Sequence, residues 1–196
     1  MRRFEREVLE DALIDEMLKM YDTVFLGLND GDFPYVVPMT FGYEMNEEGL
    51  DVYLHSATQG HKVQLMQADP HVALAFALYH DFPDRKYKGH YHDYRSVMAK
   101  GTLSFIDPQS DYETYKKGFG LLYTCNHRDI KPLDPEHLPH MYMIKVHCKR
   151  TDVTAKAEFP IRTKEDVPFL DVYALEPDST PFDLSDIIKE RRLEND

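Results

Sequence analysis

The segment from Leu50 to Lys62, LDVYLHSATQGHK, constrains the fold of this chain more than any other stretch. Residues 50–56 alternate between two sets of side chains, which is the period-two pattern of a β-strand. After Gly60 the apolar residues, among them Val63, follow helical spacing. A strand therefore ends and a helix begins within this short segment.

The first turn of that predicted helix carries two cationic side chains, His61 and Lys62, at the positive end of the macrodipole with no Asp or Glu beside them. The other predicted helices place acidic residues early and lysines late. A bound anion would resolve the conflict, because the Ser56 and Thr58 hydroxyls, free N–H groups near Gly60 and the two cations would converge on a phosphate-sized site. The alternative is a solvated surface lysine, which costs only about 0.3 to 1 kcal/mol.

Composition limits the class of partner. With 196 residues, 42% hydrophobic and 30% charged, the chain fits one globular domain, or a domain with an appendage. The formal net charge of −12 repels a polyanion, so we expect neither nucleic acid nor an anionic membrane as a partner. Any phosphate ligand must then bind through a local cationic site.

The expected compartment follows from what the chain lacks. Only Cys125 and Cys148 are present, and neither has a sequence context that marks a nucleophile. There is no signal-peptide-like apolar segment at the start and no apolar run near the length of a membrane span. We therefore expect a cytoplasmic protein with two free thiols.

Alternation and short apolar runs predict a chain made mainly of strands. Strands are predicted at residues 23–28, 35–43, 50–55, 71–79, 94–105, 141–146 and 153–157. Helices are predicted at residues 1–20, about 62–68 and 109–123. The domain would cover residues 1–158, followed by a partly extended appendage at 159–196 with a short helix at 185–192.

Several segments carry more specific expectations. Residues 29–32 have turn chemistry that joins the first two strands into a hairpin. Pro38 cannot donate a ladder hydrogen bond, so it should lie at an edge, a bulge or a ligand-facing gap. The apolar run 71–79 is expected to be buried on both sides, and the polar residues 80–93 to form a long loop. Gly101 suggests a bulge or a close backbone approach.

The order of these elements indicates the fold class. Strands in hairpin order, with helices inserted and no regular βαβ alternation, favour a mainly antiparallel sheet. We predict a mainly β protein of the α+β type, closed into a small barrel with helices at its ends.

Three segments of the chain resemble the pyridoxamine 5′-phosphate oxidase-related flavoproteins, in this order and at these spacings: GLNDGDFPYVVPMTFGY, VYLHSATQGHK and YRSVMAKGTLSF. The resemblance extends from about the first helix to Val146 and is closest to the branch associated with 5-nitroimidazole antibiotic resistance. It implies an antiparallel split β-barrel of six to seven strands. It also implies a homodimer with one FMN per subunit at the interface.

The same resemblance implies which residues contact the flavin. They are Pro38, Met39 and Thr40 beside the isoalloxazine ring, His55 and Ser56 at the strand end, Gly60, His61 and Lys62 in the phosphate-binding turn, and Ser96 on the later strand. Strand alternation puts Arg95 on the face opposite Ser96, where it would pair with a carboxylate or with the second subunit. No side chain need act as an acid or a base, because the flavin carries the hydride or electrons.

Two function classes remain. The first is an FMN-dependent oxidoreductase that reduces a small acceptor such as a nitroaromatic (nitroimidazole) or a quinone. The second is a non-catalytic flavin- or haem-binding protein, a sensor or carrier, on the same barrel. The chain has no tryptophan, and the C-terminal tryptophan and arginine that vitamin oxidases of this family use for substrate are not recognisable, which counts against pyridoxamine phosphate oxidation. Without a GxGxxG fingerprint, NADH or NADPH would bind only transiently over the flavin.

Two histidine pairs have spacings that a transition metal can use, His90 with His92 and His137 with His140. No carboxylate or thiol completes an obvious set of ligands, so we predict no metal site. His90 and His92 are expected to line the mouth of a flavin pocket or to lie in solvent.

Overall fold

The computed structural model describes residues 6–84, 89–125 and 141–157, and for residues 80–84 and 89–93 it describes the backbone alone. The predicted appendage at 159–196, with its short helix, lies outside these ranges. The elements are β1 Glu7–Val8, α1 Asp11–Leu18, β2 Val24–Asp30, β3 Phe33–Met39, β4 Gly42–Asn46, β5 Gly49–Ala57, α2 His61–Ala68, β6 His71–Asp84, β7 Gly89–Ile106, α3 Tyr112–Cys125, β8 Met141–Lys149, a 3₁₀ turn Arg150–Asp152 and β9 Val153–Ala157.

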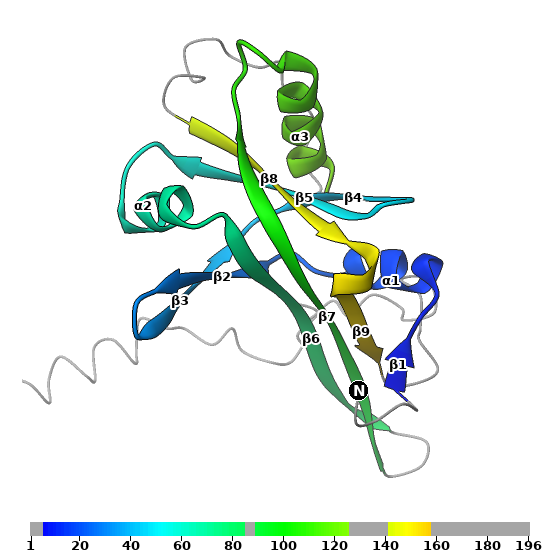
Figure 1. Cartoon of the computed structure of the whole chain (residues 1–196). Coiled ribbons are helices and arrows are strands. Elements are labelled where there is room, and N and C mark those ends of the chain that lie inside the picture. The colour runs from blue at the N-terminus through cyan, green and yellow to red at the C-terminus, as the bar shows by residue number, and fades with distance from the viewer. Residues whose placement is uncertain (1–5, 85–88, 126–140, 158–196) are drawn as a thin grey trace, which may run out of the picture. The chain divides into compact units, whose positions relative to one another are not determined.

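The strands form one antiparallel sheet, and seven of them follow the order β3-β2-β6-β7-β8-β5-β4 (Figure 1). The two remaining strands lie off this path, since β9 pairs with β7 and β1 pairs with β9. The sheet curls around one hydrophobic cluster to which most of its strands contribute. The prediction of an antiparallel split barrel is confirmed, and the seven-strand path matches the expected strand number.

The inner face of the sheet carries the core, and the outer face is covered only in part. In β6, Val72, Leu74 and Phe76 are buried on the inner face, while Ala73 and Tyr79 are exposed on the outer one. The prediction that residues 71–79 are buried on both sides is therefore wrong. The run is apolar on both faces, but no helix lies over the outer face of β6 in the described part of the chain.

One part of the outer face is covered by α3, which packs on β4, β5 and β8 (Figure 1). Two glycines allow this close packing. A Cβ atom on Gly42 would lie 2.5 Å from the backbone carbonyl carbon of Leu121, and one on Gly118 would lie 2.6 Å from Cδ1 of Tyr53. A second, smaller apolar cluster lies between the helix and the sheet, with Tyr115 and Leu122 from α3 and Tyr53, Ile106 and Met143 from the strands.

The N-terminal segment differs from its prediction. The helix begins at Asp11 rather than near residue 1, and Glu7 and Val8 form a strand paired with β9. Leu9 lies outside the helix and is 67% exposed, and its carbonyl oxygen accepts a hydrogen bond from Arg150 at 2.7 Å. Strand pairing with β9 and the Arg150 hydrogen bond thus determine the structure of residues 7–9, although their sequence has helical periodicity.

Two further boundaries differ. The predicted strand 35–43 is interrupted at Thr40 and Phe41, so that it forms parts of both β3 and β4. The predicted loop 80–93 is wrong for most of its length, because the backbones of 80–84 and 89–93 pair with each other as the outer part of the β6–β7 hairpin.

Two local expectations are confirmed. Pro38 lies on β3, which is at one end of the strand order, as expected for a residue that cannot donate a ladder hydrogen bond. Gly101 is a site of close approach, since a Cβ atom there would lie 2.6 Å from the carbonyl oxygen of His147. None of the helices in the described ranges has the length and apolarity needed to cross a membrane.

Candidate functional site

The turn between β5 and α2 leaves the N-terminus of the helix uncapped by any side chain. Gly60 precedes the helix with φ +120°, a backbone conformation that favours glycine, and nothing lies within 4 Å of a Cβ atom placed there. Its carbonyl oxygen accepts hydrogen bonds from the N–H groups of Val63 and Gln64 at 3.0 and 3.2 Å. No side chain caps the helix, and no acidic residue of the first turn itself offsets the positive potential of the helix start.

Lys62 points from this turn toward β3. Its Nζ lies 3.9 Å from Sδ of Met39, and the side chain is half-buried. Burial lowers the pKa of this ammonium group. Among the described residues no carboxylate pairs with it, and a thioether is only a weak acceptor. A partly desolvated cation without a counter-ion differs from the solvated lysine of the alternative interpretation and fits an anionic ligand.

His61 contacts the other end of β3 and the β2–β3 turn. Its Nε2 lies 2.7 Å from Oδ2 of Asp30, and its ring meets Tyr35 edge-on with 5.4 Å between the ring centroids. Both members of the His61–Asp30 pair are exposed. The structure therefore does not bring the two cationic side chains together as the sequence interpretation required, and of the two only Lys62 lacks a carboxylate partner among the described residues.

The two flavin contacts predicted at the end of β5, His55 and Ser56, lie on opposite faces of the sheet. Ser56 is 4% exposed on the inner face of β5, the face that carries Leu54 of the core, whereas His55 is exposed on the outer face. Met39, which Lys62 contacts, is buried at 8% exposure in that same core. Ser56 and Met39 thus face the interior of the barrel, and the half-buried Lys62 contacts Met39. Pro38 and Thr40 are exposed.

Ser96 lies on a different strand from the other predicted flavin contacts. It is on the outer face of β7, half-buried, with its hydroxyl 3.1 Å from that of Tyr94. β7 is three strands from β3 in the sheet order, a separation of about 14 Å at ordinary strand spacing. Arg95 is 1% exposed on the inner face, opposite Ser96, as the alternation predicts.

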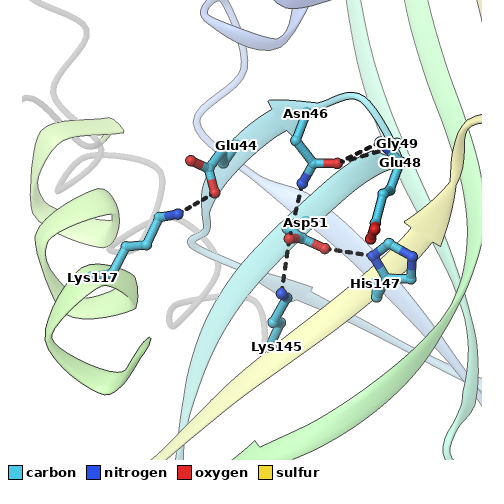
Figure 2. Close-up of polar contacts among 8 residues, drawn as sticks. All are labelled: Glu44, Asn46, Glu48, Gly49, Asp51, Lys117, Lys145 and His147. Atoms are coloured by element: carbon cyan, nitrogen blue, oxygen red, sulfur yellow. Dashed lines mark hydrogen bonds and ion pairs between the residues drawn. The ribbon is translucent and has the colours of Figure 1, made fainter. Parts of the chain in front are cut away.

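A polar cluster that sequence reasoning missed lies on the outer face of β4, β5 and β8 (Figure 2). Asp51, 4% exposed, receives Nζ of Lys145 at 2.8 Å and Nδ1 of His147 at 2.7 Å. Nδ2 of Asn46 donates to it at 3.1 Å. Burial acts to raise the pKa of Asp51, but the hydrogen bonds from Lys145 and His147 outweigh it and lower that pKa.

This cluster joins three strands rather than lining a ligand site. Oδ1 of Asn46 accepts the N–H groups of Glu48 and Gly49 at 2.9 and 3.0 Å, which closes the β4–β5 turn (Figure 2). A polar residue at position 51 is the only local signal. Its partners on β8 lie 94 and 96 positions away and become neighbours only through the β5–β8 pairing.

The remaining candidates offer little chemistry. Both cysteines are free, as expected, and burial raises the pKa of Cys125 and that of Cys148, the latter to about 12. Among the described side chains no group of three or more His, Cys, Asp or Glu residues could hold a metal ion. His137 and His140 lie outside the described residues, as do the side chains of His90 and His92.

Comparison with solved structures places this fold among proteins of related architecture. A candidate 5-nitroimidazole antibiotic resistance protein from Bacteroides thetaiotaomicron has a TM-score of 0.64 and 25% sequence identity, over 77% of this chain and 86% of that one. A FAD and heme binding protein from Mycobacterium smegmatis has a TM-score of 0.62 and 14% identity, over 83% and 78% of the two chains. A flavocytochrome from Azotobacter vinelandii has a TM-score of 0.59 and 17% identity, over 95% and 89%.

Sequence comparisons differ in what they find. No curated protein matches the sequence. The family model described as pyridoxamine 5′-phosphate oxidase matches residues 10–155, a range that includes β2 to β8 and both sides of the β5–α2 turn. The chain therefore belongs to the pyridoxamine 5′-phosphate oxidase family.

Proposed function

We propose that the chain is an FMN-binding flavoprotein that reduces a small acceptor, such as a nitroaromatic (nitroimidazole) or a quinone. The observation that carries the proposal is Lys62, a half-buried cation in an uncapped helix turn without a carboxylate partner among the described residues. Its ammonium group and the first-turn N–H groups of α2 would hold the phosphate. Family membership supports the same choice of ligand.

The residues of this chain would bind and orient the flavin rather than transfer protons. Pro38, Met39 and Thr40, on β3 and just after it, would lie beside the ring, and Lys62 already contacts Met39. Ser56 would support the strand end that faces the turn. The bound flavin supplies the redox chemistry, and NADH or NADPH would reduce it while bound only transiently. The similarity to a candidate 5-nitroimidazole resistance protein supports a nitroaromatic acceptor.

We further propose that the protein is a homodimer that completes the site. The separation of about 14 Å between β7, which carries Ser96, and β3 supports a model in which Ser96 reaches the flavin from a second copy. The outer face offers a surface for such a contact. Phe25 and Met98 are 43% and 54% exposed, and the register aligns both with Ala75 and Pro38 in one apolar row across four strands.

The test begins with the absorption spectrum of the purified protein and the identity of any released flavin. We expect a flavin spectrum, or stoichiometric uptake of added FMN, followed by bleaching with NADH or NADPH and reoxidation by a nitroaromatic or a quinone. A colourless protein that fails to bind added FMN would overturn the proposal. Binding of flavin without turnover by any acceptor, or a haem Soret band, would favour the non-catalytic alternative.

A further inference from the structure

A groove of about 630 Å³ lies on the outer face of the sheet, between β2, β3, β6 and β7 and the turn that follows β8. This volume is in the range of about 300 to 1,000 Å³ that is usual for small-molecule sites. The residues named as flavin contacts do not line it. The groove is thus separate from the β5–α2 turn.

Strand register explains why the surface is hollow there. Val36 of β3 is opposite Gly27 of β2, which is opposite Ala73 of β6, which in turn is opposite Lys100 of β7. The four residues form one row across adjacent strands on the same face. Its two central members are small, and a Cβ atom on Gly27 would meet only Ala73, at 3.5 and 3.6 Å. The groove therefore has a flat apolar floor between a Val36 wall and a lysine.

The charge at the rim of the groove is not balanced within the described residues. Lys100 and Lys149 both line the groove, and neither side-chain ammonium group has a hydrogen-bond or ion-pair partner in the part of the chain that the structure describes. Lys117 and Lys145, in contrast, each pair with a carboxylate, at 2.5 and 2.8 Å. The acidic residue of the lining is Asp152.

The other titratable group at the rim is already paired. Nδ1 of His71 lies 2.7 Å from Oδ1 of Asp69, whose other oxygen accepts from Asn29 at 2.7 Å. The backbone N–H of His71 also donates to Oδ1 of Asp69, at 2.9 Å, and this bond, together with those from Asn29 and the His71 ring, lowers the pKa of Asp69 to about 2. Among the side chains that line the groove, the two lysines outnumber the one carboxylate, in a chain whose formal net charge is −12.

We propose that this groove binds a small, flat organic anion, with its apolar ring on Gly27 and Ala73 and its carboxylate or sulfonate between Lys100 and Lys149. An apolar floor with a few polar groups that fix orientation is the usual composition of a ligand site. The inference does not depend on flavin binding, because the two sites share no named residue. Val36 is two residues before Pro38 on the same face, about 7 Å along the strand, so the groove adjoins the position proposed for the ring.

Calorimetric titration of the full-length protein with 2-naphthoate and with 2-naphthalenemethanol tests the inference. The two probes share the ring system, and only the first is charged. We expect saturable 2-naphthoate binding in both the flavin-free and the FMN-saturated protein. Lys100→Met and Lys149→Met should each weaken 2-naphthoate by about three- to tenfold and leave the neutral probe unchanged.

Three further variants separate the ring from the charge. Ala73→Leu fills the floor and should weaken both probes, whereas Asp152→Asn removes a repelling charge and should strengthen 2-naphthoate alone. Lys116→Met on the exposed face of α3 is the matched control and should change neither. Absence of saturable 2-naphthoate binding, or equal binding of both probes with no effect of the two groove lysines, would overturn the proposal.

Discussion

Nζ of Lys62 lies 3.9 Å from Sδ of Met39, although the two residues belong to different elements and are 23 positions apart. The contact brings the first turn of α2 onto the end of β3. Both segments carry the family resemblance, and in the proposed site one would hold the phosphate and the other would lie beside the ring. The proximity of Lys62 to Met39 is thus the structural link between the two halves of the proposed flavin site.

Replacing Lys62 tests the phosphate role directly. If its ammonium group binds the phosphate, Lys62→Ala removes a charge-assisted contact of about 1.5 to 3 kcal/mol and weakens FMN affinity by about ten- to a hundredfold. Riboflavin lacks the phosphate, so its affinity should hardly change. Fluorescence titration of wild type and variant with both flavins gives the two dissociation constants.

Lys116→Ala, an exposed lysine on α3, is the matched control for the loss of one positive charge and should leave both affinities unchanged. Equal weakening of FMN and riboflavin by Lys62→Ala would mean that Lys62 supports the shape of the pocket through Met39. An unchanged FMN affinity would remove the observation on which the flavin proposal depends.

The homodimer predicts that light scattering gives twice the chain mass of 23.0 kDa. Met98→Glu places a charge in the exposed apolar row of the outer face and should shift the protein toward monomer, with weaker FMN binding as a consequence. Tyr112→Glu, also at an exposed apolar position but on α3, should change neither. A wild-type monomer that holds FMN tightly would contradict the shared site.

The parts of the fold that could be predicted are those whose signal is local. The strand, the glycine and the helix around residues 50–68 appear where the change of periodicity places them. The N-terminal helix was predicted to begin near residue 1 rather than at Asp11, because the pairing of Glu7 and Val8 with β9, near the other end of the domain, has no local signal. The strand pairing of residues 80–84 with 89–93 was missed because it depends on backbone hydrogen bonds, which form whatever the side-chain composition.

The candidate site was predictable to a similar extent. Alternation alone puts His55 and Ser56 on opposite faces, so their separation was readable from the sequence. The diversion of His61 toward Asp30 was not, because it depends on how α2 lies beside the β2–β3 turn. The role of Asp51 was not predictable for a similar reason, because its partners Lys145 and His147 are distant in sequence.

The Asp51 cluster predicts a pH-dependent contribution to stability. The pKa of Asp51 is lower in the folded chain than its ordinary value, so the carboxylate stabilises the fold above the unfolded pKa, and this contribution is lost as pH falls through the folded value. Asp51→Asn should lower the free energy of unfolding by about 1 to 3 kcal/mol at pH 7. The difference from wild type should shrink below about pH 4.

Urea unfolding of wild type and Asp51→Asn at several pH values measures this difference. Asp32→Asn removes an exposed carboxylate in the β2–β3 turn and should change the unfolding free energy little at any pH. A deficit for Asp51→Asn that stays constant into the acid range would show that the side chain acts by shape or neutral hydrogen bonding, and not through its charge.

Two glycines in α3 should respond in opposite directions to the same substitution. A Cβ atom on Gly118 would lie 2.6 Å from Cδ1 of Tyr53 and 3.1 Å from Sδ of Met143, and neither side chain has room to yield, because Tyr53 and Met143 are 1% and 0% exposed. Gly118→Ala should therefore destabilise the fold, by about 1 to 3 kcal/mol.

Gly120 has nothing within 4 Å of a Cβ position. Gly120→Ala should stabilise the fold by about 0.5 to 1 kcal/mol through helix propensity. Urea unfolding of the flavin-free protein, at one fixed concentration, compares both with wild type. Equal effects of the two substitutions would contradict the close packing of α3 on β5.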